Sequence, residues 1–212
     1  MELTTDAVTR NVFMYGDITS ELIHELMQQI TQIHDYDNAL DEQIKDYERE
    51  PINLFINSCG GSLLPTIGFC EFIKHVMKTP VIGICMGEAC SAAFIVLISC
   101  HYRVSVNGAS LMAHPMSGGS IGSTRDCENV LNHMKHIEHY IIDAMRNLTK
   151  MPKEIVDEMY NKQIDKYFTP DEAKQYQIID SILGEEVESD EEEPCNIDDE
   201  EEPCNIDDDE VS

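Results

Sequence analysis

The chain has 212 residues, a formal net charge of −27, and 42% hydrophobic residues. This length is enough for one globular domain with a substantial core, and no apolar run is long enough to cross a bilayer. The negative charge repels phosphate backbones. We therefore expect a protein that binds neither membranes nor nucleic acids.

The N-terminal part alternates between strand and helix patterns. NVFMYGDI predicts a strand, and SELIHELMQQITQIH predicts an amphipathic helix because its apolar residues recur three or four positions apart. The polar residues 35–51 predict a helix end followed by a loop. After them, INLFIN (52–57) predicts a buried strand, CGGS a turn, and LLPTIGFCEFIKHVM a helix.

The same alternation continues toward the C-terminus. VIGICMG predicts a strand, SAAFIVLIS a helix, and RVSVN and SLMAHP two short strands. A glycine-rich loop, SGGSIGS, precedes a long helix over about 125–148, and a further helix begins at 151–152. TPDE (169–172) has the form of a capping box with proline at the first helical position, and IIDSIL predicts a closing strand. Alternation of this kind indicates an α/β fold.

The acidic residues are concentrated at the C-terminus. Residues 185–212 hold 16 of the 41 acids and no Lys or Arg, and within them EEEPCNIDD occurs twice in tandem. Like charges at this density resist collapse. We therefore predict a folded domain over 1–184 and a disordered acidic tail over 185–212.

The cysteines and histidines raise the question of a metal site. Most of the eight cysteines lie in apolar segments, and MELTTDAVTR shows no secretory signal, which favours a reduced, cytoplasmic setting. Cys195 and Cys204 could bind a metal together with their acidic neighbours, but a solvated tail is the favoured interpretation. His133, His136 and His139 recur every three residues and so drift around a helix. We predict no metal site and no cofactor.

Three side chains are candidates for catalysis. Taken singly, Ser91 could cap the helix that follows it, His114 could be a buried histidine at a strand end, and Asp165 could be a surface acid. Together they have a different meaning, because a hydroxyl becomes a good nucleophile when an imidazole takes its proton and a carboxylate orients that imidazole. Acyl transfer also needs an oxyanion hole, and the double glycine of INSCGGS would let the backbone approach a ligand closely.

Four segments carry a resemblance to a known family. INSCGG, CMGEACSAAF, LMAHPMSGG and DKYFTPDEAKQYQIIDSIL, in this order, resemble the signature segments of the ClpP family, the serine peptidase component of the Clp proteolytic machines. The resemblance implies that Ser91 is the nucleophile, His114 the general base and then acid, and Asp165 the orienting acid. It also implies an oxyanion hole formed by the backbone N–H groups of Gly61 and Ala92.

The resemblance covers residues 10–183 and implies a fold and an assembly. The fold would be a ClpP/crotonase-like spiral of ββα units, with the helix at 125–148 as a protruding handle. The subunits would form seven-membered rings stacked in pairs, a homo-oligomeric tetradecamer that hydrolyses peptides inside a chamber. The implied partners are an AAA+ unfoldase of the ClpX, ClpA or ClpC type, which would feed unfolded proteins, or ClpP subunits of a host.

The chain departs from the family pattern at three places. Only about nine residues precede RNVFMYGD, where the family has a longer segment that contacts the unfoldase, and this puts coupling to an unfoldase in question. Cys59 replaces the proline of INSPGG, which should loosen the turn. Gln163 and Ile164 stand where the family commonly has a charged pair for contacts between rings, so ring stacking must depend on other contacts or be weaker.

Two other functions fit parts of the sequence. The chain could be a catalytically silent structural subunit of a mixed Clp ring, although such subunits typically lack a member of the triad. It could also be a crotonase-type acyl-CoA enzyme on the same fold, although the expected CoA-binding features are not apparent. The complete set of three candidate residues favours the serine endopeptidase.

Overall fold

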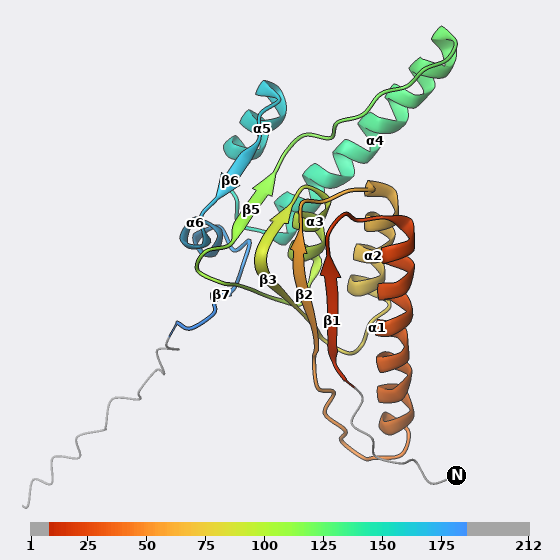
Figure 1. Cartoon of the computed structure of the whole chain (residues 1–212), viewed down its shortest axis with the longest axis vertical. Helices are drawn as coiled ribbons and strands as arrows, with labels where there is room; N and C mark the ends of the chain where they lie inside the picture. Colours follow the sequence, from red (N-terminus) through yellow and green to blue (C-terminus); the bar gives the residue numbers. More distant parts are fainter. Residues whose placement is uncertain (1–8, 186–212) are drawn as a thin grey trace, which may run out of the picture.

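The computed structural model describes residues 9–185, and in this part seven strands form one sheet that is accompanied by six helices (Figure 1). The strands are β1 (Asn11–Tyr15), β2 (Ile52–Ser58), β3 (Val81–Cys90), β4 (Tyr102–Ser105), β5 (Ser110–Ala113), β6 (Lys166–Phe168) and β7 (Ser181–Ile182). The helices are α1 (Ser20–Asp41), α2 (Leu63–His75), α3 (Ala92–Ser99), α4 (Thr124–Leu148), α5 (Lys153–Lys162) and α6 (Pro170–Gln175). The predicted α/β class is confirmed.

The central strands run parallel in the order β1-β2-β3-β4-β7, and α1 and α2 lie side by side along the sheet (Figure 1). β1 alternates between exposed and buried residues, with Val12 and Met14 in the core. α3 is different, because all eight of its residues are buried. Its uniformly apolar sequence, AAFIVLIS, is typical of a helix enclosed by the core.

The pairing of β3 changes along its length, and this change creates the candidate site. The first part of β3 pairs with β4, whereas its end pairs in parallel with β5, where Cys90 lies opposite Met112. β5 in turn pairs antiparallel with β6, and Ala113 lies opposite Lys166. The end of β3, the end of β5 and the start of β6 therefore meet at one place.

The long helix α4 projects beyond the sheet, as Figure 1 shows. Its buried residues all lie in its C-terminal half: Ile137, Ile141, Ala144 and Met145. Its N-terminal half exposes apolar side chains such as Leu131, and its first turn is stabilised by a capping box between Ser123 and Asp126. The expected protruding helix is therefore present, with bounds within one residue of the prediction.

The strands differ from the prediction at several places, among them β3, which continues three residues beyond the predicted VIGICMG to Cys90. The first strand ends before Gly16, whose φ of 79° turns the chain. In the predicted closing strand, Ile178 and Ile179 are buried in the turn after α6, so only Ser181–Ile182 pairs with β4. β6 was not predicted, because three residues are too few to show a strand period. The capping box at the start of α6 is confirmed.

Residues 9–185 contain no helix that is both long enough and apolar enough to cross a membrane. The six cysteines of this part are free thiols, and four of them are buried. The acidic repeat and its two cysteines lie outside the described residues.

Candidate active site

Ser91 stands between β3 and α3 in an unusual backbone conformation. Its φ of 56° and ψ of −121° are rare for a residue with a side chain and are maintained only where the surroundings enforce them. Its N–H donates to the carbonyl oxygen of Met112 at 2.8 Å, which ties the turn to β5. The sequence allowed Ser91 to be a helix cap. It does occupy the N-cap position of α3, but in the described structure its hydroxyl makes no capping hydrogen bond.

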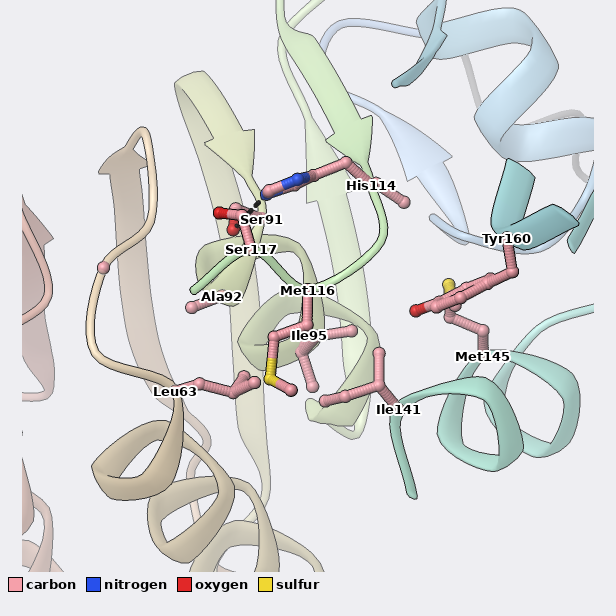
Figure 2. A pocket seen from close by; sticks show the side chains of 12 residues that line it. Leu63, Ser91, Ala92, Ile95, His114, Met116, Ser117, Ile141, Met145 and Tyr160 are labelled. Carbon is pink, nitrogen blue, oxygen red and sulfur yellow. Dashed lines mark hydrogen bonds between the residues drawn. The ribbon is translucent and has the colours of Figure 1, made fainter. Parts of the chain in front are cut away.

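The hydroxyl of Ser91 instead contacts an imidazole. His114 follows the last residue of β5, and its Nε2 lies 2.7 Å from Ser91 Oγ, which is hydrogen-bond distance (Figure 2). The His114 side chain is 23% exposed. The parallel pairing of β3 with β5 places these two residues, 23 positions apart, at the ends of neighbouring strands.

Asp165 lies next to His114 without a direct hydrogen bond. Its Oδ1 is 4.0 Å from His114 Nδ1, which is longer than a hydrogen bond, and its side chain is 57% exposed. Asp165 directly precedes β6, and Gln163 two residues earlier ends α5 in the left-handed conformation. All three predicted side chains are therefore brought to one place, with the last contact looser than the first.

Two glycines bring the turn after β2 against the start of α3. A Cβ at Gly60 would lie 2.7 Å from Ser91 Cβ and 3.1 Å from Ala92 N, and a Cβ at Gly61 would lie 2.4 Å from the carbonyl oxygen of Ile18. Both glycines also have a positive φ, of 107° and 150°. Neither position has room for a side chain, so Gly60 can approach the N-terminus of α3 closely while Gly61 packs against the backbone of Ile18.

Ser58 supports this turn, in which Cys59 stands where the family pattern has proline. The hydroxyl of Ser58 donates to the carbonyl oxygen of Gly16 at 2.5 Å and accepts from the N–H of Gly60 at 3.1 Å. Cys59 is exposed, and its thiol donates to Asp17 Oδ1 at 3.3 Å. The hydrogen bonds of Ser58 therefore hold the turn that Cys59 was expected to loosen.

The neighbouring thiols are poor alternatives to the Ser91 hydroxyl as nucleophile. Burial raises the pKa of the Cys90 thiol, and the nearby Glu88 carboxylate raises it further. The hydrogen bond to Asp17 raises the pKa of Cys59. A thiol reacts through its thiolate, so both shifts keep these groups in the less reactive form.

A pocket extends from Ser91 and His114 toward the helices α4 and α5 (Figure 2). Its lining residues come from five segments of the chain: Gly61, Leu63, Ser91, Ala92, Ile95, Ala113, His114, Met116, Ser117, Ile141, Met145 and Tyr160. The wall formed by Ile141, Met145 and Tyr160 was not predicted from the sequence. The spacing of Ile141 and Met145, four residues apart on one helical face, was the available signal.

The described residues offer no cluster for a metal. Within residues 9–185 no three His, Cys, Asp or Glu side chains come together in a group that could hold an ion. His139, one of the three histidines on α4, has its Nδ1 2.6 Å from the carbonyl oxygen of Lys135 in its own helix.

The arrangement is suited to acyl transfer. A hydroxyl in contact with an imidazole can lose its proton as it attacks a carbonyl group. Ala92 is the first residue of α3, and the first N–H groups of a helix have no acceptor within it. The chain thus presents a hydroxyl, an imidazole and the first backbone N–H groups of a helix beside one pocket.

Comparison with known proteins matches most of the chain to one protein family. The Clp protease family profile matches residues 4–186. Among similar proteins are the ATP-dependent Clp protease proteolytic subunits of Pinus contorta and Pinus thunbergii, each 28% identical over 176 residues. These alignments cover 82% of this chain, and 80% and 83% of the two relatives respectively.

Proposed function

Because the chain belongs to the Clp protease family, we propose that it is a serine-type endopeptidase with Ser91, His114 and Asp165 as its catalytic triad. The observation that carries this proposal is the 2.7 Å contact between His114 Nε2 and Ser91 Oγ. A serine and a histidine at this distance beside a pocket are the pair that nucleophilic acyl transfer requires.

The reaction follows from these atoms. Ser91 Oγ forms a bond to the carbonyl carbon of the scissile peptide while its proton moves to His114 Nε2. The carbonyl oxygen becomes an oxyanion and accepts hydrogen bonds from the N–H groups of Gly61 and Ala92. The C–N bond then breaks, and His114 gives its proton to the leaving amine.

The second half of the reaction repeats these steps with water. Water attacks the acyl-enzyme as His114 takes one of its protons, and the acid product leaves when Ser91 Oγ regains a proton from His114. Asp165 would orient the imidazole and stabilise its cation after a small movement toward Nδ1.

The proposal extends to assembly and location. We propose that subunits form stacked seven-membered rings through the protruding helix α4, with active sites facing an enclosed chamber. An AAA+ unfoldase, or ClpP subunits of a host, would be the partners. The free thiols of the described cysteines fit a cytoplasmic setting, where cysteines stay reduced.

One observation favours a second candidate. The 4.0 Å separation of His114 and Asp165, with Asp165 mostly exposed, would also fit a subunit that has lost efficient catalysis and serves as a structural member of a mixed ring. Such a subunit would assemble without hydrolysing peptides.

A fluorophosphonate probe separates the two functions, because it reacts with an activated serine. We expect labelling of the assembled protein at Ser91, located by peptide mapping, and hydrolysis of a short fluorogenic peptide. Ser91→Ala should abolish both while leaving the oligomer intact, whereas Ser20→Ala, at an exposed position at the start of α1, should change neither. A Ser91→Ala variant that retained more than about one hundredth of the rate would disprove the assignment.

A further inference from the structure

The hydroxyl of Tyr160 is buried in the active-site pocket without a partner. Within residues 9–185, its oxygen has no hydrogen bond although it is closed off from solvent. Figure 2 shows the side chain extending from α5 into the pocket, on the opposite side from Ser91. Buried polar atoms are nearly always paired in folded proteins, so an unpaired hydroxyl in a ligand pocket points to a missing ligand group.

The polar side chains that line the rest of this pocket, Ser117 with Ser91 and His114, gather on the side opposite Tyr160, and between the two sides the lining side chains are apolar (Figure 2). Leu63, Ile95, Met116, Ile141 and Met145 line this part, and among the described lining residues of the pocket there is no Lys, Arg, Asp or Glu. An apolar wall with one polar atom at its far side is the usual form of a specificity pocket. The apolar part would accommodate the stem of a substrate side chain, and a small movement of Tyr160 on binding would bring its hydroxyl to the tip.

The hydroxyl is a hydrogen-bond donor over the whole physiological range. Burial raises the pKa of Tyr160, and the Glu138 carboxylate adds to the shift, so the group stays protonated. A neutral acceptor is the best partner for it. A carboxylate would be buried without a cation among the lining residues, which is unfavourable.

We propose that this pocket selects glutamine as the substrate residue before the scissile bond, with Tyr160 donating a hydrogen bond to its side-chain amide oxygen. The proposal rests on the serine peptidase function proposed above. Glutamine has the straight, flexible stem that an apolar pocket accepts and an acceptor at its end. Asparagine is shorter than glutamine. Its amide would not reach Tyr160, because Tyr160 and Ser91 lie on opposite sides of the pocket (Figure 2).

The test uses assembled protein and fluorogenic peptides that differ only in the residue before the scissile bond: glutamine, methionine, leucine or glutamate. Methionine is the matched control for glutamine because it has a similar length without the amide. We expect the wild type to cleave the glutamine peptide at least as efficiently as the methionine peptide, and the glutamate peptide poorly.

Tyr160→Phe removes only the hydroxyl. In this variant the ratio of kcat/KM for glutamine over methionine should fall about tenfold, which corresponds to about 1.4 kcal/mol. The methionine peptide should be cleaved as well as before. Tyr102→Phe, at an exposed tyrosine on β4, should leave the ratio unchanged.

The outcomes separate this proposal from the function on which it rests. If Ser91 is labelled and the methionine peptide is cleaved, but Tyr160→Phe leaves the ratio unchanged, the proposal for Tyr160 is wrong and the peptidase function stands. If no peptide is cleaved and Ser91 is not labelled, both are wrong. If Tyr160→Phe does not fold, the wild type alone decides: faster cleavage of the methionine peptide than of the glutamine peptide overturns the proposal.

Discussion

His114 lies within hydrogen-bond distance of Ser91 but not of Asp165. Its Nε2 lies 2.7 Å from Ser91 Oγ, whereas its Nδ1 lies 4.0 Å from Asp165 Oδ1. The first contact joins the residues that directly follow the neighbouring strands β3 and β5. The second depends on the short segment between α5 and β6, which carries the mostly exposed Asp165. Closure of this second contact would complete the proposed triad.

Substitution of Asp165 tests whether the carboxylate acts on the imidazole during catalysis. Asp165→Asn keeps the shape of the side chain but favours the wrong tautomer of His114, so kcat should fall at least about a hundredfold. Steady-state hydrolysis of a fluorogenic peptide measures the change. Asp171→Asn, at an exposed acid in the first turn of α6, is the control and should alter the rate less than about twofold. Equal rates for both variants would show that Asp165 has no role in catalysis.

A second prediction concerns the glycine turn that faces Ser91. Gly60→Ala would place a Cβ 2.7 Å from Ser91 Cβ and 2.8 Å from the carbonyl oxygen of Cys90, at a φ of 107°. Because the turn or the nucleophile must move, we expect at least about a hundredfold loss of kcat, since catalysis depends on the positions of the reacting atoms. Peptide hydrolysis and fluorophosphonate labelling measure this loss.

Gly68→Ala is the matched control for this substitution. Gly68 lies within α2, and a Cβ there would have nothing within 4 Å in the described structure. Alanine is more favourable than glycine in a helix by about 1 kcal/mol, so this variant should be slightly more stable and fully active. If Gly60→Ala kept the rate of Gly68→Ala, the close approach of the turn to Ser91 would have no catalytic importance.

The sequence could predict the parts of this structure that depend on local pattern. The capping box of Thr169 and Glu172 and the long helix α4 are both present as predicted, because caps and helical periods are encoded within a few residues. The segments that carry Ser91 and His114 were identified from short motifs. Their side chains are in contact because β3 and β5 are paired.

The remaining features depend on contacts between distant segments. The positive φ of Ser91 is enforced by the pairing of β3 with β5, and no residue type in GEACSAAF specifies it. The position of Tyr160 in the pocket depends on how α5 packs beside α4. The 4.0 Å separation of His114 and Asp165 depends on side-chain orientation, which a linear motif does not encode.

A buried carboxylate outside the candidate site joins helix α1 to three other segments. Asp37, near the end of α1, has a fully buried side chain that accepts two hydrogen bonds from Arg10, at 2.6 and 3.0 Å. It also accepts from Thr79 at 2.7 Å and from Tyr47 at 3.0 Å. Burial alone would raise the pKa of Asp37, but these hydrogen bonds, from Arg10 first, outweigh it and hold the pKa below its usual value.

A lowered pKa in the folded state fixes the direction of a pH effect. The contribution of Asp37 to stability is complete above the pKa of an aspartate in the unfolded chain, about 3.9, and is lost as the pH falls through the lower folded value. Asp37→Asn should therefore reduce the free energy of unfolding by about 3 kcal/mol at pH 7, because it leaves Arg10 without its buried partner and with only the exposed Glu50 carboxylate beside it. The difference from the wild type should shrink below about pH 4.

Urea denaturation at pH 7 and at several values below pH 4 measures this effect. Asp157→Asn is the control, because Asp157 and its partner Arg146 are both partly exposed to solvent. Its loss should cost less than about 1 kcal/mol at any pH. If Asp37→Asn and the wild type differed by the same amount at every pH, the charge of Asp37 would not be what stabilises the fold.

The last prediction concerns the acidic C-terminal segment. Residues 185–212 carry 16 acids and no Lys or Arg. The described part ends at Glu185, whose carboxylate lies 2.5 Å from Lys174 Nζ and accepts a hydrogen bond from the N–H of Ile182 at 3.3 Å. A chain that ends at Glu185 keeps these contacts, and one that ends at Gly184 loses them. Comparison of the two with the full chain separates the role of the repeat from the role of this one residue.

We expect both shortened chains to fold, to assemble as the full chain does, and to cleave small peptides at rates within about twofold of it, because like charges at this density add little to a folded core. The chain ending at Gly184 should be slightly less stable than the chain ending at Glu185, since an exposed ion pair contributes little. Native mass and peptidase rate on the same samples measure these effects. A tenfold loss of rate or a broken assembly in both chains would make the acidic segment a structural element, whereas a loss confined to the Gly184 chain would move the domain boundary to 185.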